Sequence, residues 1–175
     1  FCDIRKFTAM SESMSPEKVV SLLNKYFTEM EKCISKNHGI INKYIGDAVM
    51  GIFGAPVKSE NHALDAFNAA MEMRVALESL NKKLEGSDFP QIAFGIGLHS
   101  GDVLAGNIGA ENRIEYTVIG DTVNTASRIE SLCKSYQKDL LMSESTCKLI
   151  LDAAAGEIAA RQDDFVFVDE ADIRG

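Results

Sequence analysis

The amino-acid sequence predicts an α+β fold, a two-layer sandwich with a ferredoxin-like βαββαβ core to which further strands and helices are added. Two long stretches carry apolar residues at helical spacing, and short stretches rich in β-forming residues lie before, between and after them. They follow one another in the order strand, helix, strand, strand, helix, strand. Helices that alternate with a partly antiparallel sheet in this order are typical of the ferredoxin-like architecture.

The beginning of the chain predicts one strand and one long helix. Residues 1–4 (Phe-Cys-Asp-Ile) are typical of the end of a strand. Ser15-Pro16-Glu17 predicts a helix start, because serine caps a helix, proline suits its first position and an acidic residue is favoured in its first turn. Gly39 ends the helix. Its expected apolar positions are Val19, Val20, Leu23, Tyr26, Phe27, Met30 and Ile34.

A Gly-Asp pair predicts a hairpin and, with it, the meeting of two carboxylates. Gly46-Asp47 separates the β-rich residues 40–45 and 48–53, which is a hairpin signal. In a ferredoxin-like core the first strand lies antiparallel beside the third, so the end of the first strand meets the start of the third. Asp3 ends the first strand and Asp47 precedes the third. We therefore expect the two carboxylates to converge at one edge of the sheet.

The rest of the chain predicts a second long helix, followed by alternating strands and helices. The second helix follows Ser59, and Gly86 and Pro90 end it. Its apolar stripe consists of Ala63, Phe67, Ala70, Met71, Leu77, Leu80 and Leu84. Further strands are expected over residues 92–99, 103–108, 114–119, 140–142 and 165–168. Further helices are expected over residues 123–136 and from Ser143 onward.

Length and composition indicate one globular domain. The chain has 175 residues, of which 46% are hydrophobic and 25% are charged, and these proportions exclude a disordered or fibrous protein. Both ends look cut, so we expect a single domain over residues 1–175 that comes from a longer multidomain protein.

The charge balance limits the partners of this domain. It has 18 basic and 26 acidic residues, a net charge of −8, which argues against binding to nucleic acid or to an anionic membrane through bulk charge. A small anionic ligand held by a few cations remains compatible. No apolar run can span a bilayer and no secretory signal starts the chain. We expect a cytoplasmic domain, attached to a membrane only through flanking segments, with four reduced cysteines.

Five polar residues are candidates for chemistry. Asp3 and Asp47 together suit divalent cations of the Mg²⁺ type, although a plain turn and a solvated carboxylate are the alternative. Lys43 precedes the turn, and its alternative is a solvated lysine at a sheet edge. Asn124 and Arg128 share one helix face, where they could hold a nucleotide or form an ordinary polar surface. The residues alone indicate metal-assisted phosphate chemistry and leave the reaction open.

Three sequence blocks resemble the signature motifs of class III nucleotidyl cyclases. They are residues 1–8 (FCDIRKFT), residues 43–47 (KYIGD) and residues 115–128 (EYTVIGDTVNTASR). They occur in the family's order, at family-like intervals, across nearly the whole chain. The chain therefore resembles an adenylate cyclase catalytic domain, which would convert ATP to 3′,5′-cyclic AMP and pyrophosphate.

The resemblance implies a metal and triphosphate site. Asp3, Asp47 and the backbone carbonyl of Ile4 match the ligands of two divalent cations, Mg²⁺ or Mn²⁺. The backbone amides around Phe7 and Thr8 match those that cradle the triphosphate.

The resemblance also implies residues for the base and for the transition state. Asn124 and Arg128 match the residues that orient the ribose and stabilise the transition state, and Lys43 and Thr117 match the pair that reads the purine. Lys43 only donates hydrogen bonds and Thr117 can accept, a combination that suits adenine, whereas relatives that use GTP typically carry an acid at the lysine position. Many adenylate cyclases have aspartate in place of Thr117. The threonine hydroxyl can both donate and accept, which predicts looser discrimination between ATP and GTP. Threonine is similar to a subset that includes bicarbonate-responsive enzymes, which makes bicarbonate sensitivity a hypothesis.

Two positions depart from the family pattern. Asp102 stands where some relatives have a phosphate-contacting arginine, and the family's triphosphate-binding lysine would fall at or just beyond Gly175. Because both halves of the composite family site are present, the resemblance implies a head-to-tail homodimer with two shared sites. The alternatives are a guanylate cyclase, a catalytically silent nucleotide-binding or dimerisation domain, and a metal-binding interaction domain.

Overall fold

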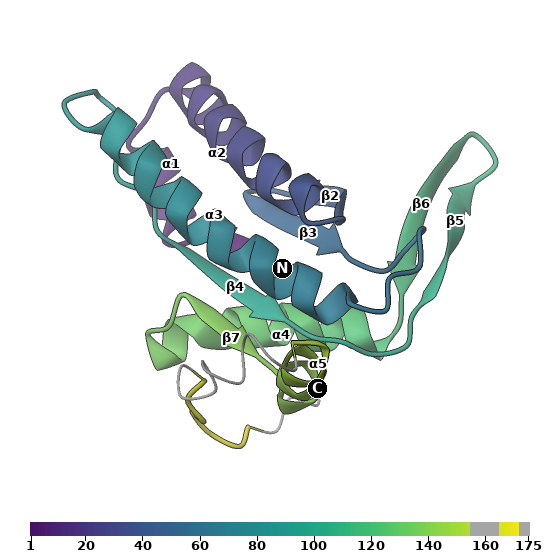
Figure 1. Cartoon of the computed structure of the whole chain (residues 1–175). Coiled ribbons are helices and arrows are strands. Elements are labelled where there is room, and N and C mark those ends of the chain that lie inside the picture. The colour runs from purple at the N-terminus through teal and green to yellow at the C-terminus, as the bar shows by residue number, and fades with distance from the viewer. Residues whose placement is uncertain (155–164, 172–175) are drawn as a thin grey trace.

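A computed structural model of the chain, which describes residues 1–154 and 165–171, shows a five-stranded sheet with helices on both faces and a separate two-stranded ribbon (Figure 1). The strands are β1 (Cys2–Ile4), β2 (Ile40–Ile45), β3 (Ala48–Ile52), β4 (Phe94–Leu98), β5 (Leu104–Ala110), β6 (Arg113–Ile119) and β7 (Leu140–Met142). The helices are α1 (Phe7–Glu12), α2 (Pro16–Lys36), α3 (His62–Leu84), α4 (Asp121–Tyr136) and α5 (Glu144–Ala153).

The sheet has the strand order β2-β3-β1-β4-β7. Strand β1 pairs antiparallel with both β3 and β4, β2 pairs antiparallel with β3, and β7 pairs parallel with β4. The elements β1, α2, β2, β3, α3 and β4 therefore form the expected ferredoxin-like core, and β7 is an added strand. Strands β5 and β6 pair only with each other among the described strands, and they project from the body of the domain as a ribbon (Figure 1).

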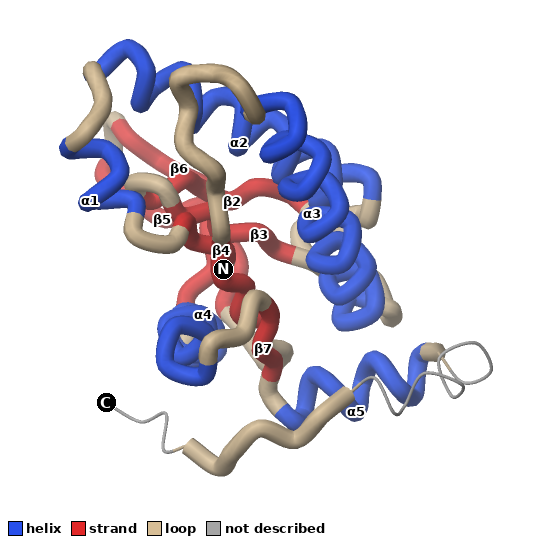
Figure 2. The backbone as a smooth tube through the Cα atoms, turned by 90° about the vertical axis from the view of Figure 1, so that its left-hand side faces the viewer, coloured by secondary structure: helices blue, strands red, loops and turns tan. Residues whose placement is uncertain are grey.

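The main core lies between the sheet and the helices α2 and α3. Leu22, Tyr26 and Met30 on α2 have no exposed surface, and they pack against sheet residues such as Val49 and Ile96. Figure 2 shows α4 away from α2 and α3, on the other side of the sheet.

A smaller apolar cluster attaches the ribbon and α4 to that second face. Met50 and Ile52 of β3 pack there with Val118 of β6, and Val123 of α4 packs against the same cluster. A Cβ atom at Gly97 would overlap the backbone of Ala126 and Glu130 in α4. Glycine at this position of β4 therefore lets the helix lie directly on the strand.

Most predicted elements are confirmed, with small shifts in their limits. Helix α2 begins after Ser15, whose hydroxyl accepts a hydrogen bond from the Lys18 amide. Helix α4 begins at Asp121, two residues before the expected start. Within α2 the expected apolar face was partly wrong, because Val20 is 57% exposed and Leu22 is fully buried. Leu22 lies one helical turn before Tyr26 and so shares its face.

The predicted strand over residues 165–168 is wrong. Residues 165–171 are described and contain no strand. The Phe165 ring packs against the Phe67 ring, with 5.3 Å between their centroids, while Val166 and Phe167 are 75% and 79% exposed. This short apolar run therefore lacks the hydrogen-bonded neighbour that a strand requires.

Among the described helices, none is both long enough and apolar enough to cross a membrane.

Candidate active site

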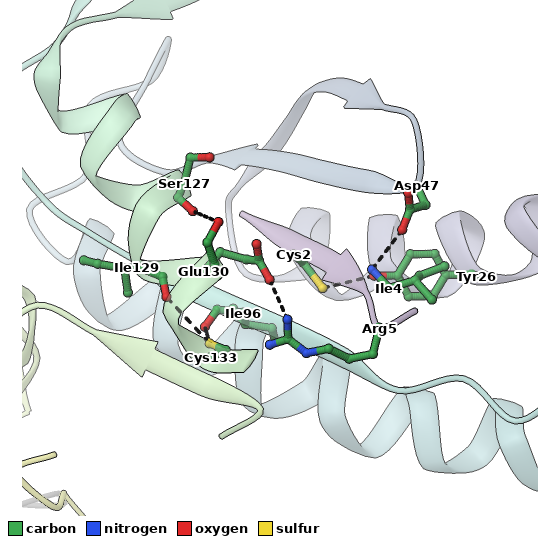
Figure 3. A network of polar contacts seen from close by, with 11 residues as sticks. Cys2, Ile4, Arg5, Tyr26, Asp47, Ile96, Ser127, Ile129, Glu130 and Cys133 are labelled. Atoms are coloured by element: carbon green, nitrogen blue, oxygen red, sulfur yellow. Dashed lines mark hydrogen bonds and ion pairs between the residues drawn. The ribbon is translucent and has the colours of Figure 1, made fainter. Parts of the chain in front are cut away.

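The structure brings Asp3 and Asp47 together at the end of β1. Cys2 pairs with Val49 across the antiparallel β1–β3 ladder, so the end of β1 lies beside the hairpin turn that carries Asp47. The Ile4 amide donates a hydrogen bond to Asp47 Oδ2 at 3.2 Å (Figure 3). We call Asp3, Ile4 and Asp47 the acidic corner. The convergence that the topology predicts is therefore present.

Burial and charge act together on the acidic corner. The pKa of Asp47 is raised to about 7, first by burial and then by the hydrogen bond and negative charge of Asp3, while the Ile4 amide opposes the shift. Two ionised carboxylates here would repel each other in a partly desolvated place. A divalent cation would relieve that repulsion, and carboxylate and carbonyl oxygens are the ligands that Mg²⁺ and Mn²⁺ accept.

The acidic corner cannot by itself saturate a cation. In the part of the chain that the structure describes, no three or more His, Cys, Asp or Glu side chains cluster as a metal site. Mg²⁺ commonly binds through one or two carboxylates, with phosphate and water completing its coordination. The residues present therefore fit a cation that is shared with a phosphate ligand.

Phe7 and Thr8 open the short helix α1, a few residues after the acidic corner. Lys6 precedes them in a left-handed conformation with φ 57°, and the amide of Met10 donates to the Lys6 carbonyl. The first amides of a helix have no acceptor within the helix. The backbone amides of Phe7 and Thr8 are therefore donors without an acceptor inside α1.

Lys43 and Thr117 come from different sheets, and contacts between β2 and β6 bring their strands together. Lys43 Nζ lies 3.8 Å from Glu115 Oε2. Glu115 stands two residues before Thr117, so both side chains project from the same face of β6. Thr117 is only 8% exposed, and its hydroxyl donates to Asn42 Oδ1 at 2.9 Å. We call Asn42, Lys43, Glu115 and Thr117 the ribbon corner.

Sequence reasoning missed Asn42 and Glu115. Asn42 also donates through Nδ2 to the Tyr116 carbonyl at 2.9 Å, so it makes two hydrogen bonds to β6. A sequence signal was available, because asparagine is disfavoured inside a strand and its presence between Ile41 and Lys43 needs a reason. Glu115 carries no comparable signal, since a charged residue is ordinary on an exposed ribbon.

Asn124 and Arg128 lie one turn apart on α4, with Asn124 exposed and Arg128 half-buried. An ion pair also joins this helix to Arg5, the residue that follows β1. Arg5 Nη1 lies 3.2 Å from Glu130 Oε1 (Figure 3), and the pKa of Glu130 is raised by burial and by Asp3, against the opposing charge of Arg5. The ion pair thus links the strand that carries Asp3 to the helix that carries Arg128.

The acidic corner and the ribbon corner make no polar contact with each other among the described residues. In residues 1–154 and 165–171, no hydrogen bond or ion pair joins Asp3 or Asp47 to Lys43 or Thr117. Asp102 is exposed, and its carbonyl accepts from the Thr122 hydroxyl at 2.7 Å. The position expected for a triphosphate-binding lysine lies outside the described residues.

The sequence is similar to a known protein family and to characterised relatives. A sequence profile of the family described as adenylate and guanylate cyclase catalytic domain matches residues 1–174. An adenylate cyclase of Anabaena cylindrica is 42% identical over 152 residues, which cover 85% of this chain and 29% of that protein. Adenylate cyclase 1 of Rhizobium meliloti is 38% identical over 143 residues, 82% of this chain and 22% of that protein. The chain thus spans less than a third of these relatives.

Solved structures of both substrate classes resemble the fold. The guanylyl cyclase Cya2 has a TM-score of 0.79 and 37% identity, over 85% of this chain and 75% of its own. The adenylyl cyclase CyaB from P. aeruginosa has a TM-score of 0.78 and 36% identity, over 86% of this chain and 78% of its own. The backbone is therefore equally similar to proteins named for either nucleotide.

Proposed function

We propose that this chain, which belongs to the family of adenylate and guanylate cyclase catalytic domains, converts ATP to 3′,5′-cyclic AMP and pyrophosphate. The family and the α+β fold predicted from the sequence are both confirmed. The observation that carries the proposed activity is the acidic corner, because two adjacent carboxylates beside a helix start suit a metal-bound triphosphate. The choice of ATP rests on Lys43 and Thr117.

Asp3, Asp47 and the carbonyl of Ile4 would hold two divalent cations, Mg²⁺ or Mn²⁺. When bound, such cations lower the pKa of a ribose hydroxyl and neutralise charge on the phosphates. The two carboxylates must be ionised to bind cations. Because the pKa of Asp47 is raised to about 7, protons compete with a cation for this carboxylate. The backbone amides of Phe7 and Thr8 would donate hydrogen bonds to the triphosphate oxygens.

Two residues of α4 would act on the reacting atoms. In the reaction the ribose 3′-oxygen forms a bond to the α-phosphorus, the bond from that phosphorus to the pyrophosphate oxygen breaks, and the 3′-hydroxyl proton is released. Asn124 would hold the ribose so that the 3′-oxygen attacks in line with the leaving oxygen. Arg128 would donate to the α-phosphate oxygens and neutralise the negative charge that develops there.

The ribbon corner supports ATP over GTP as the substrate. Adenine offers a hydrogen-bond acceptor at N1 and a donor at its 6-amino group, and Lys43 and Thr117 can complement both. Guanine presents a donor at N1 and an acceptor at O6, so the Lys43 ammonium would face another donor. Since the fold resembles adenylyl and guanylyl cyclases equally well, these side chains rather than the backbone carry the choice.

A head-to-tail homodimer with two shared sites completes the proposal. The ribbon and the neighbouring end of β2 expose several large apolar side chains, and these are Ile45 (53%), Leu104 (66%), Ile114 (61%) and Ile119 (48%). Such an apolar group on a projecting ribbon favours a protein partner. Because no polar contact joins the acidic corner to the ribbon corner among the described residues, each of two copies could supply one corner to each site.

The test is cyclic-nucleotide production from ATP or GTP with Mg²⁺ or Mn²⁺. We expect cyclic AMP from ATP, and loss of the product in Asp47→Asn, which keeps the shape of the side chain and removes its charge. Faster turnover of GTP would contradict the choice of ATP. Metal-dependent ATP binding without turnover would indicate a silent nucleotide-binding domain. Absence of any nucleotide binding would indicate a metal-binding interaction domain instead.

A further inference from the structure

We propose that Asn42 sets the base selectivity of the site, by holding the hydroxyl of Thr117 as a hydrogen-bond acceptor for the 6-amino group of adenine. This inference rests on the proposed function, because it concerns how Lys43 and Thr117 read the purine. Asn42 is a positioning residue in this scheme, since it contacts Thr117 and acts on the base only through that hydroxyl.

A bulge in β2 lets the Asn42 side chain contact β6. The β2–β3 ladder pairs Ile41 with Gly51 and Lys43 with Met50, which are adjacent on β3, so Asn42 is the extra residue. In a regular strand, neighbouring side chains project from opposite faces. Here Asn42 and Lys43 both contact β6, because the bulge turns two successive side chains toward the ribbon. The irregularity therefore builds the ribbon corner.

The two bonds of Asn42 determine where the Thr117 proton lies. The Tyr116 carbonyl can only accept, so the Asn42 amide group must face it and donate at 2.9 Å. That orientation leaves Oδ1 facing the Thr117 hydroxyl, and because Oδ1 can only accept, the hydroxyl must donate. The hydroxyl proton of Thr117 is therefore used in this hydrogen bond, and the Thr117 oxygen can only accept further hydrogen bonds.

Because its proton is used in this bond, the Thr117 hydroxyl can no longer act as a donor to the base. A free hydroxyl can donate to O6 of guanine or accept from the 6-amino group of adenine with equal ease. With its proton held by Asn42, the Thr117 oxygen accepts from adenine and opposes the O6 oxygen of guanine. Lys43 can donate to the N1 acceptor of adenine, whereas it would face the N1–H donor of guanine. The looser discrimination expected from threonine in place of aspartate is therefore corrected by a neighbour on another strand.

Two substitutions at one position separate selectivity from structure. Asn42→Leu removes both hydrogen bonds and frees the Thr117 hydroxyl. Asn42→Asp keeps an acceptor for that hydroxyl, loses the donor to the Tyr116 carbonyl and adds a negative charge beside Lys43. We expect the ATP-to-GTP ratio of kcat/KM to fall about tenfold or more in Asn42→Leu and to stay within about threefold in Asn42→Asp. Asn68→Leu, the same change on the exposed surface of α3, is the matched control.

A double variant tests whether Asn42 acts through Thr117. In a Thr117→Val background, adding Asn42→Leu should leave the ATP-to-GTP ratio unchanged, because the hydroxyl is already absent. An independent change there would overturn the inference. So would an unchanged ratio in Asn42→Leu, or equal losses in Asn42→Leu and Asn42→Asp, which would indicate that Asn42 only holds the ribbon in place.

A binding measurement keeps this test separate from the test of the proposed function. Dissociation constants for α,β-methylene analogues of ATP and GTP are measured with Mg²⁺ in the same variants by calorimetry. If the parent chain makes no cyclic nucleotide but prefers the ATP analogue, and Asn42→Leu loses that preference by about tenfold, the inference stands while the proposed activity fails. If the parent chain binds neither analogue, or binds both equally, the inference is overturned.

Discussion

The acidic corner and the ribbon corner are held in place in different ways. Asp3 and Asp47 are positioned by the backbone ladders of a central strand, which pairs on both sides, and by the amide of Ile4. The ribbon corner joins strands of two sheets, and side-chain contacts, above all those of Asn42, connect them. The first arrangement follows from the fold, whereas the second depends on individual side chains.

This difference has a chemical logic. The family includes domains that act on ATP and domains that act on GTP, and phosphate and metal chemistry is common to both nucleotides. A corner fixed by backbone pairing suits the shared chemistry, because no single side chain can reposition it. A corner fixed by side chains suits the base, because one substitution can alter which base fits. We therefore expect substitutions in the acidic corner to lower activity with either nucleotide. Substitutions in the ribbon corner should change the preference between ATP and GTP.

The largest effect is expected at the acidic corner. Asp47→Ala should lower kcat for cyclic AMP formation about 10³-fold or more, because a cation ligand is lost, while the ATP-to-GTP ratio of any residual activity stays the same. Initial rates with both nucleotides measure both quantities. A substantial change in the ratio would show that the acidic corner also reads the base, and the contrast between the corners would then be wrong.

Mixing inactive variants tests whether the acidic corner of one chain meets Arg128 of another chain in one site. An equal mixture of Asp47→Ala and Arg128→Ala should recover about a quarter of the parent activity, since half of the dimers would carry one intact site out of two. The matched control mixes Asp47→Ala with Asp3→Ala, two changes in the same corner, and should recover none. Equal behaviour of the two mixtures would contradict shared sites.

The next largest effect is expected at the ribbon corner. Lys43→Glu should lower kcat/KM for ATP about 100-fold and raise it for GTP, because a carboxylate accepts from guanine N1–H where the ammonium faced a donor. Stability should change little, since Lys43 is partly exposed and its contact with Glu115 is long. Lys58→Glu, an equal charge change at an exposed loop position, serves as the control. A loss that is equal for both nucleotides would show that Lys43 does not read the base.

The same contrast explains how far the sequence alone could go. The meeting of Asp3 and Asp47 follows from a topological rule and a Gly-Asp turn, so it could be predicted without coordinates. The bulge at Asn42 could not, because it depends on the register of β2 against β3, and the bonds of Asn42 run to β6 in a separate sheet.

Two further differences have similar causes. The apolar face of α2 was predicted with Val20 rather than Leu22, since spacing indicates a helical stripe more reliably than its phase. The apolar residues 165–168 predict a strand, but a strand also needs a paired neighbour, which no local pattern reveals.

A smaller effect is expected where a side chain does support the acidic corner. Glu130→Gln keeps the shape of a buried residue and removes the negative partner of Arg5, so it should lower the free energy of unfolding by about 1–3 kcal/mol. Asp88→Asn, which breaks the exposed pair with Lys18, should cost less than about 0.5 kcal/mol. Urea unfolding of both variants gives the comparison. Equal costs would show that the Arg5–Glu130 pair adds no more than a surface contact.

The smallest effect is the stabilisation of the acidic corner by a cation alone. Because the pKa of Asp47 is raised to about 7 without metal, ionisation of this carboxyl weakens the folded state as pH rises through that value, and protons compete with a cation below it. Mg²⁺ without nucleotide should therefore raise Tm by about 3 °C at pH 8 and by less than about 1 °C at pH 5.5. Asp47→Asn should remove the increase at pH 8. An increase that is the same at both pH values, or that survives Asp47→Asn, would place the cation elsewhere, and the acidic corner would lose its assigned role.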